Sequence, residues 1–145
     1  MTAEVDVMKI LIVDDEIHIR SLLEQTLEEL EEEHGVTIIS ASSGEEGLER
    51  IEKERPSLVF LDIMMPGMSG YEVCRAVRAR PHLAGTRVIL LTAKGQVMDR
   101  EEGLASGALD YLTKPFDPDR VVERARRALG IAAGNSERRE DEIQE

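Results

Sequence analysis

The residues of this chain best suited to chemistry stand where short apolar runs end. Asp14 and Asp15 follow the apolar run 10–13, and Asp62 follows the run 58–61. Apolar runs of this length between helical stretches are typical of buried parallel strands. The carboxyl ends of such strands form the binding crevice of an open sheet. We therefore expect the three carboxylates to lie around one pocket.

Two further polar residues follow the same pattern. Thr92 ends the run 88–91, and Lys114 ends a weaker run, 109–113, directly before Pro115. Two carboxylates about 4 Å apart repel by about 4 kcal/mol at an effective dielectric constant near 20. A cluster of three therefore either raises a pKa or binds a cation. Mg2+ suits the set, because it takes carboxylates, waters and a phosphate rather than a full cage of protein ligands.

Length and composition restrict the class of protein. A chain of 145 residues predicts one domain with short extensions. The net charge of −12 argues against nucleic-acid binding, which needs a basic patch, and against binding to an anionic membrane. The only cysteine, Cys74, excludes an internal disulfide, so we expect a cytoplasmic location. No apolar stretch approaches the roughly 18 residues of a membrane span, and the acidic start lacks the features of a signal peptide.

Hydrophobic periodicity predicts five strand–helix repeats. Strands are expected at residues 9–13, 36–41, 57–61, 87–91 and 109–113, and helices at 17 to about 32, 43 to about 53, from Ser69 or Gly70 onwards, at about 97–105 and at 117–129. This alternation predicts an α/β fold, a doubly wound five-stranded parallel sheet with helices on both faces. Residues 1–8 are expected to form a flexible arm and 9–130 the domain. Residues 131–145 are expected to form an acidic tail, either disordered or the start of a linker.

The first predicted helix has an unusual end. Leu22, Leu23, Leu27 and Leu30 are expected on one face of it, but residues 28–33 include five glutamates. Negative charge at a helix C-terminus opposes the helix dipole. We interpret the acidic run as a solvated, fraying end that lengthens the loop before the next strand, and not as a metal site.

Four motifs, in matching order and at matching spacing, resemble those of bacterial two-component response-regulator receiver domains of the chemotaxis-regulator type. They are IVDDE at residues 12–16, LDIMMPGMSG at 61–70, LTA at 91–93 and YLTKPF at 111–116. The likeness covers about residues 9–130. It implies a flavodoxin-like (βα)5 fold with strand order 2-1-3-4-5. It also implies Mg2+-dependent phosphoryl transfer to the domain from a sensor histidine kinase, a phosphotransfer protein or a small acyl phosphate.

The resemblance implies a role for each carboxylate. Asp62 matches the aspartate that is phosphorylated. Asp14 and Asp15 match the pair that holds Mg2+, for which Mn2+ can substitute. Asp62 and the backbone carbonyl of Met64 are expected to complete the protein ligands of the metal.

The resemblance also implies how the phosphoryl group is sensed. Thr92 matches the hydroxyl that bonds the phosphoryl group, and Lys114 matches the lysine that contacts it. Tyr111 matches the aromatic switch residue. In this family the bond between the lysine and the following proline, here Pro115, is often cis.

Phosphorylation is expected to change the surface formed by the helix at about 97–105, the strand at 109–113 and the last helix. The expected partners are the kinase and an unknown downstream partner. A second copy of the chain, bound through this face as a homodimer, is a further expected partner. No direct contact with nucleic acid or membrane is expected. The domain would be a signalling phosphoacceptor that assists its own phosphorylation and dephosphorylation, rather than an enzyme.

Three alternatives compete with this interpretation. Phosphatases with an aspartate nucleophile carry Asp-x-Asp, whereas here Met64 stands at the second Asp position after Asp62. Nucleotide- or flavin-binding modules need a glycine-rich phosphate loop, and the chain has no such motif. A receiver domain that docks without being phosphorylated is the third alternative, and the complete acid set argues against it.

Overall fold

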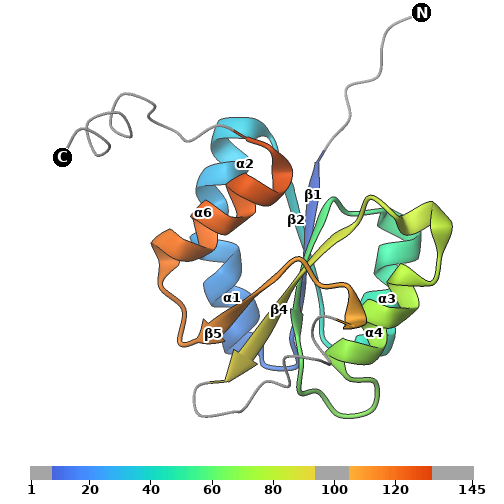
Figure 1. The fold of residues 1–145 in the computed structure, drawn as a ribbon. Coiled ribbons are helices and arrows are strands. Elements are labelled where there is room, and N and C mark those ends of the chain that lie inside the picture. Colours follow the sequence, from blue (N-terminus) through green and yellow to red (C-terminus); the bar gives the residue numbers. More distant parts are fainter. Residues whose placement is uncertain (1–7, 94–104, 132–145) are drawn as a thin grey trace, which may run out of the picture.

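Five parallel strands in the order β2-β1-β3-β4-β5 form the centre of the molecule (Figure 1). The computed structural model describes residues 8–93 and 105–131. The strands are β1 (Lys9–Val13), β2 (Thr37–Ala41), β3 (Leu58–Asp62), β4 (Arg87–Ala93) and β5 (Asp110–Lys114). The predicted fold class and strand order are confirmed.

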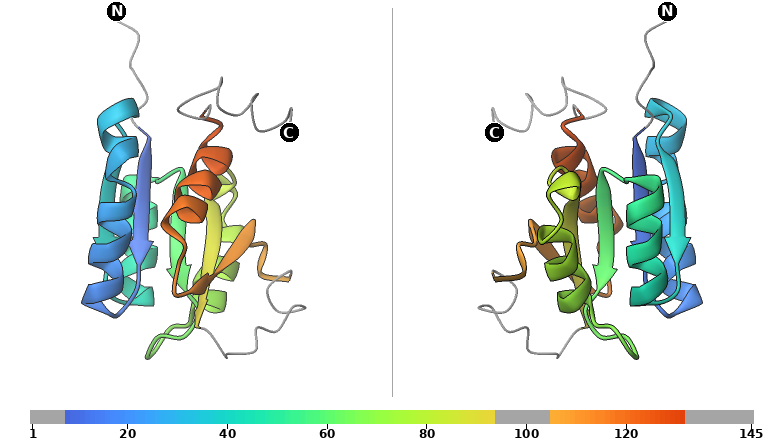
Figure 2. Two further views of the ribbon diagram at one scale, coloured as in Figure 1. Left: turned by 90° about the vertical axis from the view of Figure 1, so that its left-hand side faces the viewer. Right: turned by 90° about the vertical axis from the view of Figure 1, so that its right-hand side faces the viewer.

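Helices cover both faces of this sheet (Figure 2). One layer holds α1 (Ile17–Thr26), α2 (Glu28–His34) and α6 (Pro118–Leu129), and the other holds α3 (Gly44–Glu54) and α4 (Gly70–Arg78). A 3-10 turn, η1 (Pro81–Leu83), precedes β4. Within the described segments, no helix is long and apolar enough to span a bilayer.

The three inner strands are apolar on both sides because each side packs on a helical layer. Ile10, Ile12 and Phe60 belong to the core under α1, α2 and α6. Leu11 and Leu61 belong to the core under α3 and α4. Alternate residues of one strand therefore enter different cores, which explains the continuous apolar runs. The same packing fixes the register and so the position of the polar residue after each run.

The predicted continuous helix from 17 to about 32 is wrong: it is broken at Leu27, where α1 ends and α2 begins. The hydroxyl of Thr26 donates to the carbonyl of Leu22 at 2.7 Å, a local bond that competes with the helical pattern. Leu23, Leu27 and Leu30 are fully buried as predicted, whereas Leu22 is 41% exposed. The leucines still face the core on both sides of the break, because the break contains only one irregular residue, Leu27.

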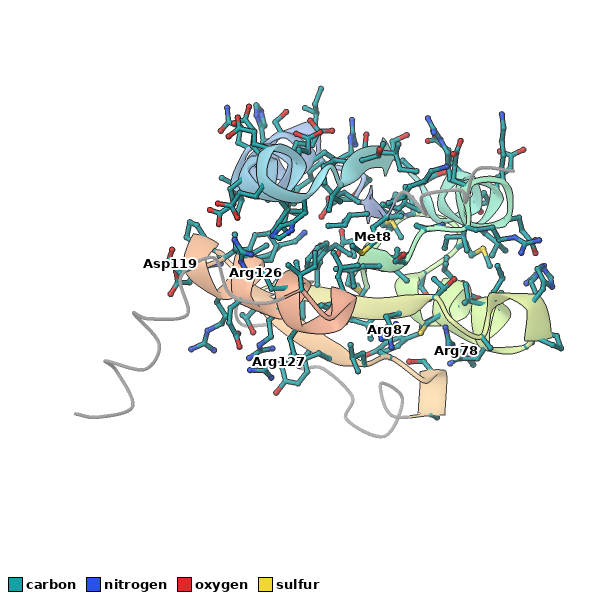
Figure 3. All side chains as sticks on the ribbon, turned by 90° about the horizontal axis from the view of Figure 1, so that it is seen from above. Met8, Arg78, Arg87, Asp119, Arg126 and Arg127 are labelled. Atoms are coloured by element: carbon teal, nitrogen blue, oxygen red, sulfur yellow. The ribbon has the colours of Figure 1, made fainter. Side chains whose placement is uncertain are left out.

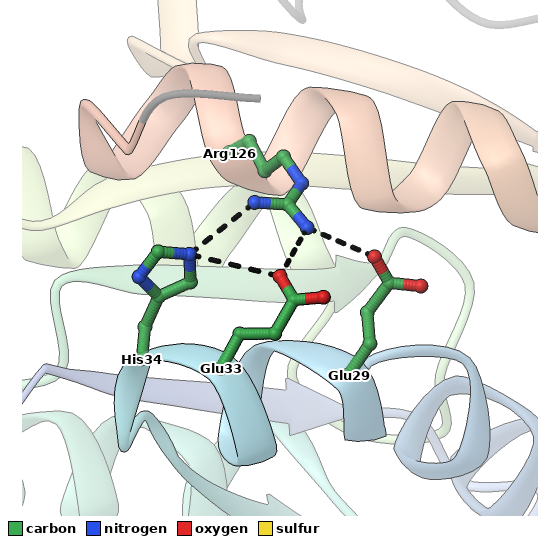
Figure 4. A network of polar contacts seen from close by, with 4 residues as sticks. All are labelled: Glu29, Glu33, His34 and Arg126. Atoms are coloured by element: carbon green, nitrogen blue, oxygen red, sulfur yellow. Dashed lines mark hydrogen bonds and ion pairs between the residues drawn. The ribbon is translucent and has the colours of Figure 1, made fainter. Parts of the chain in front are cut away.

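The acidic run does not fray into a loop but forms α2, and Arg126 of α6 explains why. Its Nη2 donates to Glu29 Oε2 at 2.9 Å and to Glu33 Oε1 at 2.8 Å, and its Nη1 lies 3.3 Å from His34 Nε2 (Figure 4). Seen from above, Arg126 lies on the side of α6 that faces α2, while Arg127 lies on the opposite side (Figure 3). The charge of the two glutamates is thus partly offset by an arginine from a distant part of the chain.

Local contacts explain how several helices begin and end. Gly35 ends α2 in the left-handed conformation, which glycine adopts without strain. Ser43 accepts from the amide of Glu46 at 3.1 Å, but the Glu46 carboxylate accepts from Ser42 instead, so only half of a capping box starts α3. Asp117 caps α6 by accepting from the amide of Asp119. Residues 1–7, the predicted helix at 97–105 up to residue 104, and residues 132–145 lie outside the described residues.

Candidate functional site

The site lies where β1 and β3 end side by side. Val13 pairs with Leu61 in the parallel register, so Asp14 and Asp62 follow at the same level. Asp14 is fully buried and Asp62 is 5% exposed, whereas Asp15 is exposed. One carboxylate oxygen from each of these residues lies within 4.8 Å of the others. The structure thus brings together the three carboxylates that the sequence predicted to meet.

Lys114, at the end of β5, supplies the positive charge beside these acids. Its Nζ lies 2.9 Å from Asp14 Oδ2, 3.5 Å from Asp62 Oδ2 and 3.8 Å from Glu16 Oε1. Burial lowers the pKa of Lys114, but the bond to Asp14 and the neighbouring carboxylate charges outweigh it and raise the pKa. The lysine therefore stays protonated, and it lies closer to Asp14 than to Asp62. The Lys114–Pro115 bond is cis, as the resemblance implied.

The electrostatics of Asp62 show that one ammonium group does not balance the cluster. Burial, followed by the charge of Asp14, raises the pKa of Asp62 to about 6, although Lys114 and the amide of Met64 act in the opposite direction. Most of the Asp62 carboxyl is still ionised at pH 7. It is a buried carboxylate whose charge is only partly compensated.

Close packing of the loop between β3 and α4 holds Asp62 in place. A Cβ atom on Gly70 would collide with the carbonyl oxygen of Asp62 and approach the Cα of Ile63 to 2.9 Å, so only glycine fits. Ser69 and Glu72 form a complete capping box that starts α4 at this point. The amide of Met64 lies 3.3 Å from Asp62 Oδ1, while its side chain is 63% exposed.

Thr92 and Tyr111 lie on the two strands beyond β3. Leu91 of β4 pairs with Asp62, so the buried Thr92 follows one residue further toward the same end of the sheet. Tyr111 of β5 is 44% exposed and lines a groove between β5 and α6. The candidate phosphoryl-binding hydroxyl thus lies at the acid cluster's end of the sheet, and the candidate switch ring lies on the outer strand.

The donor set fits a hard divalent cation. Asp14, Asp15 and Asp62 offer only oxygen ligands, and these lie close enough together to share one ion at the short distances that Mg2+ requires. Burial and then the charge of Asp14 raise the pKa of Asp62 more than Lys114 lowers it, so Lys114 only partly compensates the cluster. A divalent cation would add positive charge, with the carbonyl of Met64 as a further oxygen in the same loop.

Two polar residues near the cluster were not among the predicted site residues. Glu16 lies 3.8 Å from the ammonium of Lys114, and Arg20 donates to the carbonyl of Asp14. Glu16 lies within the IVDDE motif, so the sequence indicated its position near the site but not its contact with Lys114. No sequence pattern marks a side chain that binds a backbone carbonyl six residues earlier.

Comparisons with known proteins agree with this geometry. The profile of the family described as "Response regulator receiver domain" matches residues 10–126. The alkaline phosphatase synthesis transcriptional regulatory protein PhoP of Bacillus subtilis is 42% identical over 139 residues, which cover 94% of this chain and 55% of that protein. The probable transcriptional regulator ycf27 of Porphyra purpurea is 47% identical over 121 residues, which cover 83% of this chain and 47% of that protein.

Solved structures show the same fold. A putative response regulator from Chloroflexus aurantiacus has a TM-score of 0.77 at 35% identity, covering 86% of this chain and 99% of that one. The chemotaxis protein CheY4 of Vibrio cholerae has a TM-score of 0.75 at 32% identity, covering 85% and 99% respectively. This chain spans about half the length of the curated relatives it matches, but nearly the whole length of these structures.

Proposed function

The chain belongs to the response regulator receiver domains, the signalling domains of two-component systems, and on this premise we propose that Asp62 accepts a phosphoryl group. The observation that carries the proposal is the buried cluster of Asp14, Asp15 and Asp62 with Lys114 beside it. The phosphoryl donor is a phosphohistidine on a sensor kinase or phosphotransfer protein, or a small acyl phosphate.

Asp62 acts as the nucleophile. Even without a bound cation, where its pKa is about 6, the carboxylate is mostly ionised at neutral pH and so is available to attack phosphorus. A carboxylate oxygen forms the new bond to phosphorus while the bond to the donor breaks and its electron pair leaves with the donor. The product is an acyl phosphate on Asp62, which water later hydrolyses.

Two side chains and a bound cation would compensate the charge of the transferred group. Asp14, Asp15, Asp62 and the carbonyl of Met64 would hold Mg2+, which would supply positive charge to the transferred group. The ammonium of Lys114, 3.5 Å from Asp62 Oδ2, donates to one phosphoryl oxygen. The hydroxyl of Thr92 donates to another.

The new hydrogen bonds drive the switch. Moving a two-state equilibrium from 1:99 to 99:1 requires about 5.5 kcal/mol, and two or three charge-assisted hydrogen bonds approach that value. Thr92 moves toward the phosphoryl group, and Tyr111 turns inward from its half-exposed position. The surface around β5 and α6 changes as a result and binds a downstream partner or a second copy of the chain.

The wider role follows from the relatives. PhoP and ycf27 are named as transcriptional regulators, so we infer that the switch controls transcription through a partner or another part of the protein. The domain works in the cytoplasm as a phosphoacceptor, and any enzymatic contribution is limited to its own phosphorylation and dephosphorylation.

The test is Mg2+-dependent labelling by acetyl phosphate, followed by intact-protein mass spectrometry. The wild-type protein is expected to gain one phosphoryl group, and Asp62→Asn none. Asp119→Asn, a matched change on the exposed first turn of α6, is the control and is expected to label normally. A wild-type protein that stays unlabelled in Mg2+ would instead favour a receiver domain that docks without phosphorylation.

A further inference from the structure

One arginine, Arg20, contacts the end of β1 although it is not part of the acid cluster. Arg20, in the first turns of α1, donates from Nη1 to the carbonyl oxygen of Asp14 at 2.7 Å. Its side chain is partly buried. The carbonyl that it holds belongs to the peptide that joins Asp14 to Asp15. Arg20 therefore acts on the backbone between two of the three carboxylates.

The two aspartates depend on this peptide to different degrees. Asp14 is fixed independently, because its Oδ1 accepts from the amide of Glu16 at 2.9 Å and its Oδ2 pairs with Lys114. Its own amide donates to the carbonyl of Ala41 at 3.2 Å. The Asp15 side chain is exposed and makes no hydrogen bond or ion pair with the other residues that the structure describes. Its position is therefore set by the backbone alone.

The guanidinium of Arg20 also lies near the start of α3. The pKa of Glu46 is lowered by its hydrogen bonds with Ser42, and less strongly by the charges of Arg50 and Arg20. Arg20 therefore lies within electrostatic reach of the first turn of α3 while it binds the end of β1.

We propose that Arg20 is a positioning residue for the metal site. By holding the peptide between Asp14 and Asp15, it presents the Asp15 carboxylate to the cation that Asp14 and Asp62 also bind. The inference rests on the proposed function, since it assumes that a divalent cation occupies the acid cluster.

The proposal predicts the opposite sign from simple electrostatics. Arg20 carries a positive charge near a cation site, so removing it would strengthen Mg2+ binding if charge repulsion were its main effect. If Arg20 positions Asp15, removing it weakens Mg2+ binding. Loss of an outer-shell partner of a metal ligand typically lowers metal affinity by about 10- to 100-fold.

The experiment measures Mg2+ affinity by titration, followed through the amide resonances in 1H–15N NMR spectra. Arg20→Met and Arg20→Gln both remove the charge and the long donor, and the polar Gln variant suits a partly exposed position if Met impairs folding. Arg20→Lys keeps a charged donor of similar reach. Arg50→Met is the control, because Arg50 pairs with Glu54, which binds Lys9 at the opposite end of β1. Thermal unfolding without metal verifies that each variant is folded.

Arg20→Met and Arg20→Gln are expected to raise the Mg2+ dissociation constant about tenfold, and Arg20→Lys to stay within about threefold of the wild type. Arg50→Met should not change it. Acetyl phosphate labelling of Arg20→Met should return to the wild-type rate at saturating Mg2+. Unchanged or tighter Mg2+ binding in both Arg20→Met and Arg20→Gln would overturn the inference. Continued labelling of Asp62→Asn would instead refute the proposed function and leave the affinity comparison valid.

Discussion

Replacing Asp62 by asparagine is expected to stabilise the metal-free protein at neutral pH. The fold raises the pKa of Asp62 from its ordinary value of 3.8 to about 6, chiefly by burial and then by the charge of Asp14. A raised carboxyl pKa means that the folded state favours the protonated form more than the unfolded state does. Ionised Asp62 therefore costs stability, and asparagine, which resembles the protonated form, removes that cost.

The magnitude follows from the shift of about 2 pH units at 1.36 kcal/mol each, which gives about 3 kcal/mol. The full cost is present above pH 6, where both the folded and the unfolded states are ionised. It falls to about half near pH 5 and to about a fifth at pH 4, and it vanishes below about pH 3, where both states are protonated. For a domain of this size, about 3 kcal/mol corresponds to a rise of about 10 °C in the unfolding midpoint.

The assay is thermal unfolding of wild type and Asp62→Asn at pH 7, 5 and 4, with a chelator present to keep divalent cations away. The stabilisation is expected to be large at pH 7 and to shrink steadily toward pH 4. Asp119→Asn on the exposed turn of α6 provides the matched control and should show little change. A stabilisation that is absent at pH 7, or that is equal at all three pH values, would refute the electrostatic account of the cluster.

Three further changes probe the site and the fold around it. Gly70→Ala is expected to destabilise the protein by about 1–3 kcal/mol and to slow labelling, because its Cβ would collide with the loop, whereas Gly85→Ala has open space and should be neutral in chemical unfolding. Arg126→Met should lower stability by about 1 kcal/mol through its lost bonds to α2, while the exposed Arg127→Met should have little effect in the same unfolding assay. Lys114→Met removes a charge that lowers the pKa of the nucleophile, so the rise of labelling rate with pH should shift upward; an unchanged pH profile would contradict this.

The acid cluster could be predicted from sequence because its geometry follows from strand topology. Asp14 and Asp62 each follow a buried run, and neighbouring parallel strands bring such ends together. The sequence did not reveal that Lys114 lies closer to Asp14 than to Asp62, since both acids are within reach and only packing decides between them.

The end of the first helical region shows the opposite case. The spacing of Leu23, Leu27 and Leu30 fits a continuous helix equally well, so periodicity could not reveal the break at Leu27. The acidic run of α2 is stabilised by Arg126, which lies more than 90 residues away in sequence. Local propensity gives no information about a partner at that distance.

The central claim, that Asp62 is the phosphoacceptor, is tested most directly by locating the modification. The protein is treated with acetyl phosphate and Mg2+, digested under conditions that preserve acyl phosphates, and analysed by tandem mass spectrometry. The account predicts that the phosphoryl group is found on Asp62 and that a chelator prevents its appearance. A phosphoryl group on Asp14, Asp15 or another residue, with Asp62 unmodified, would contradict it.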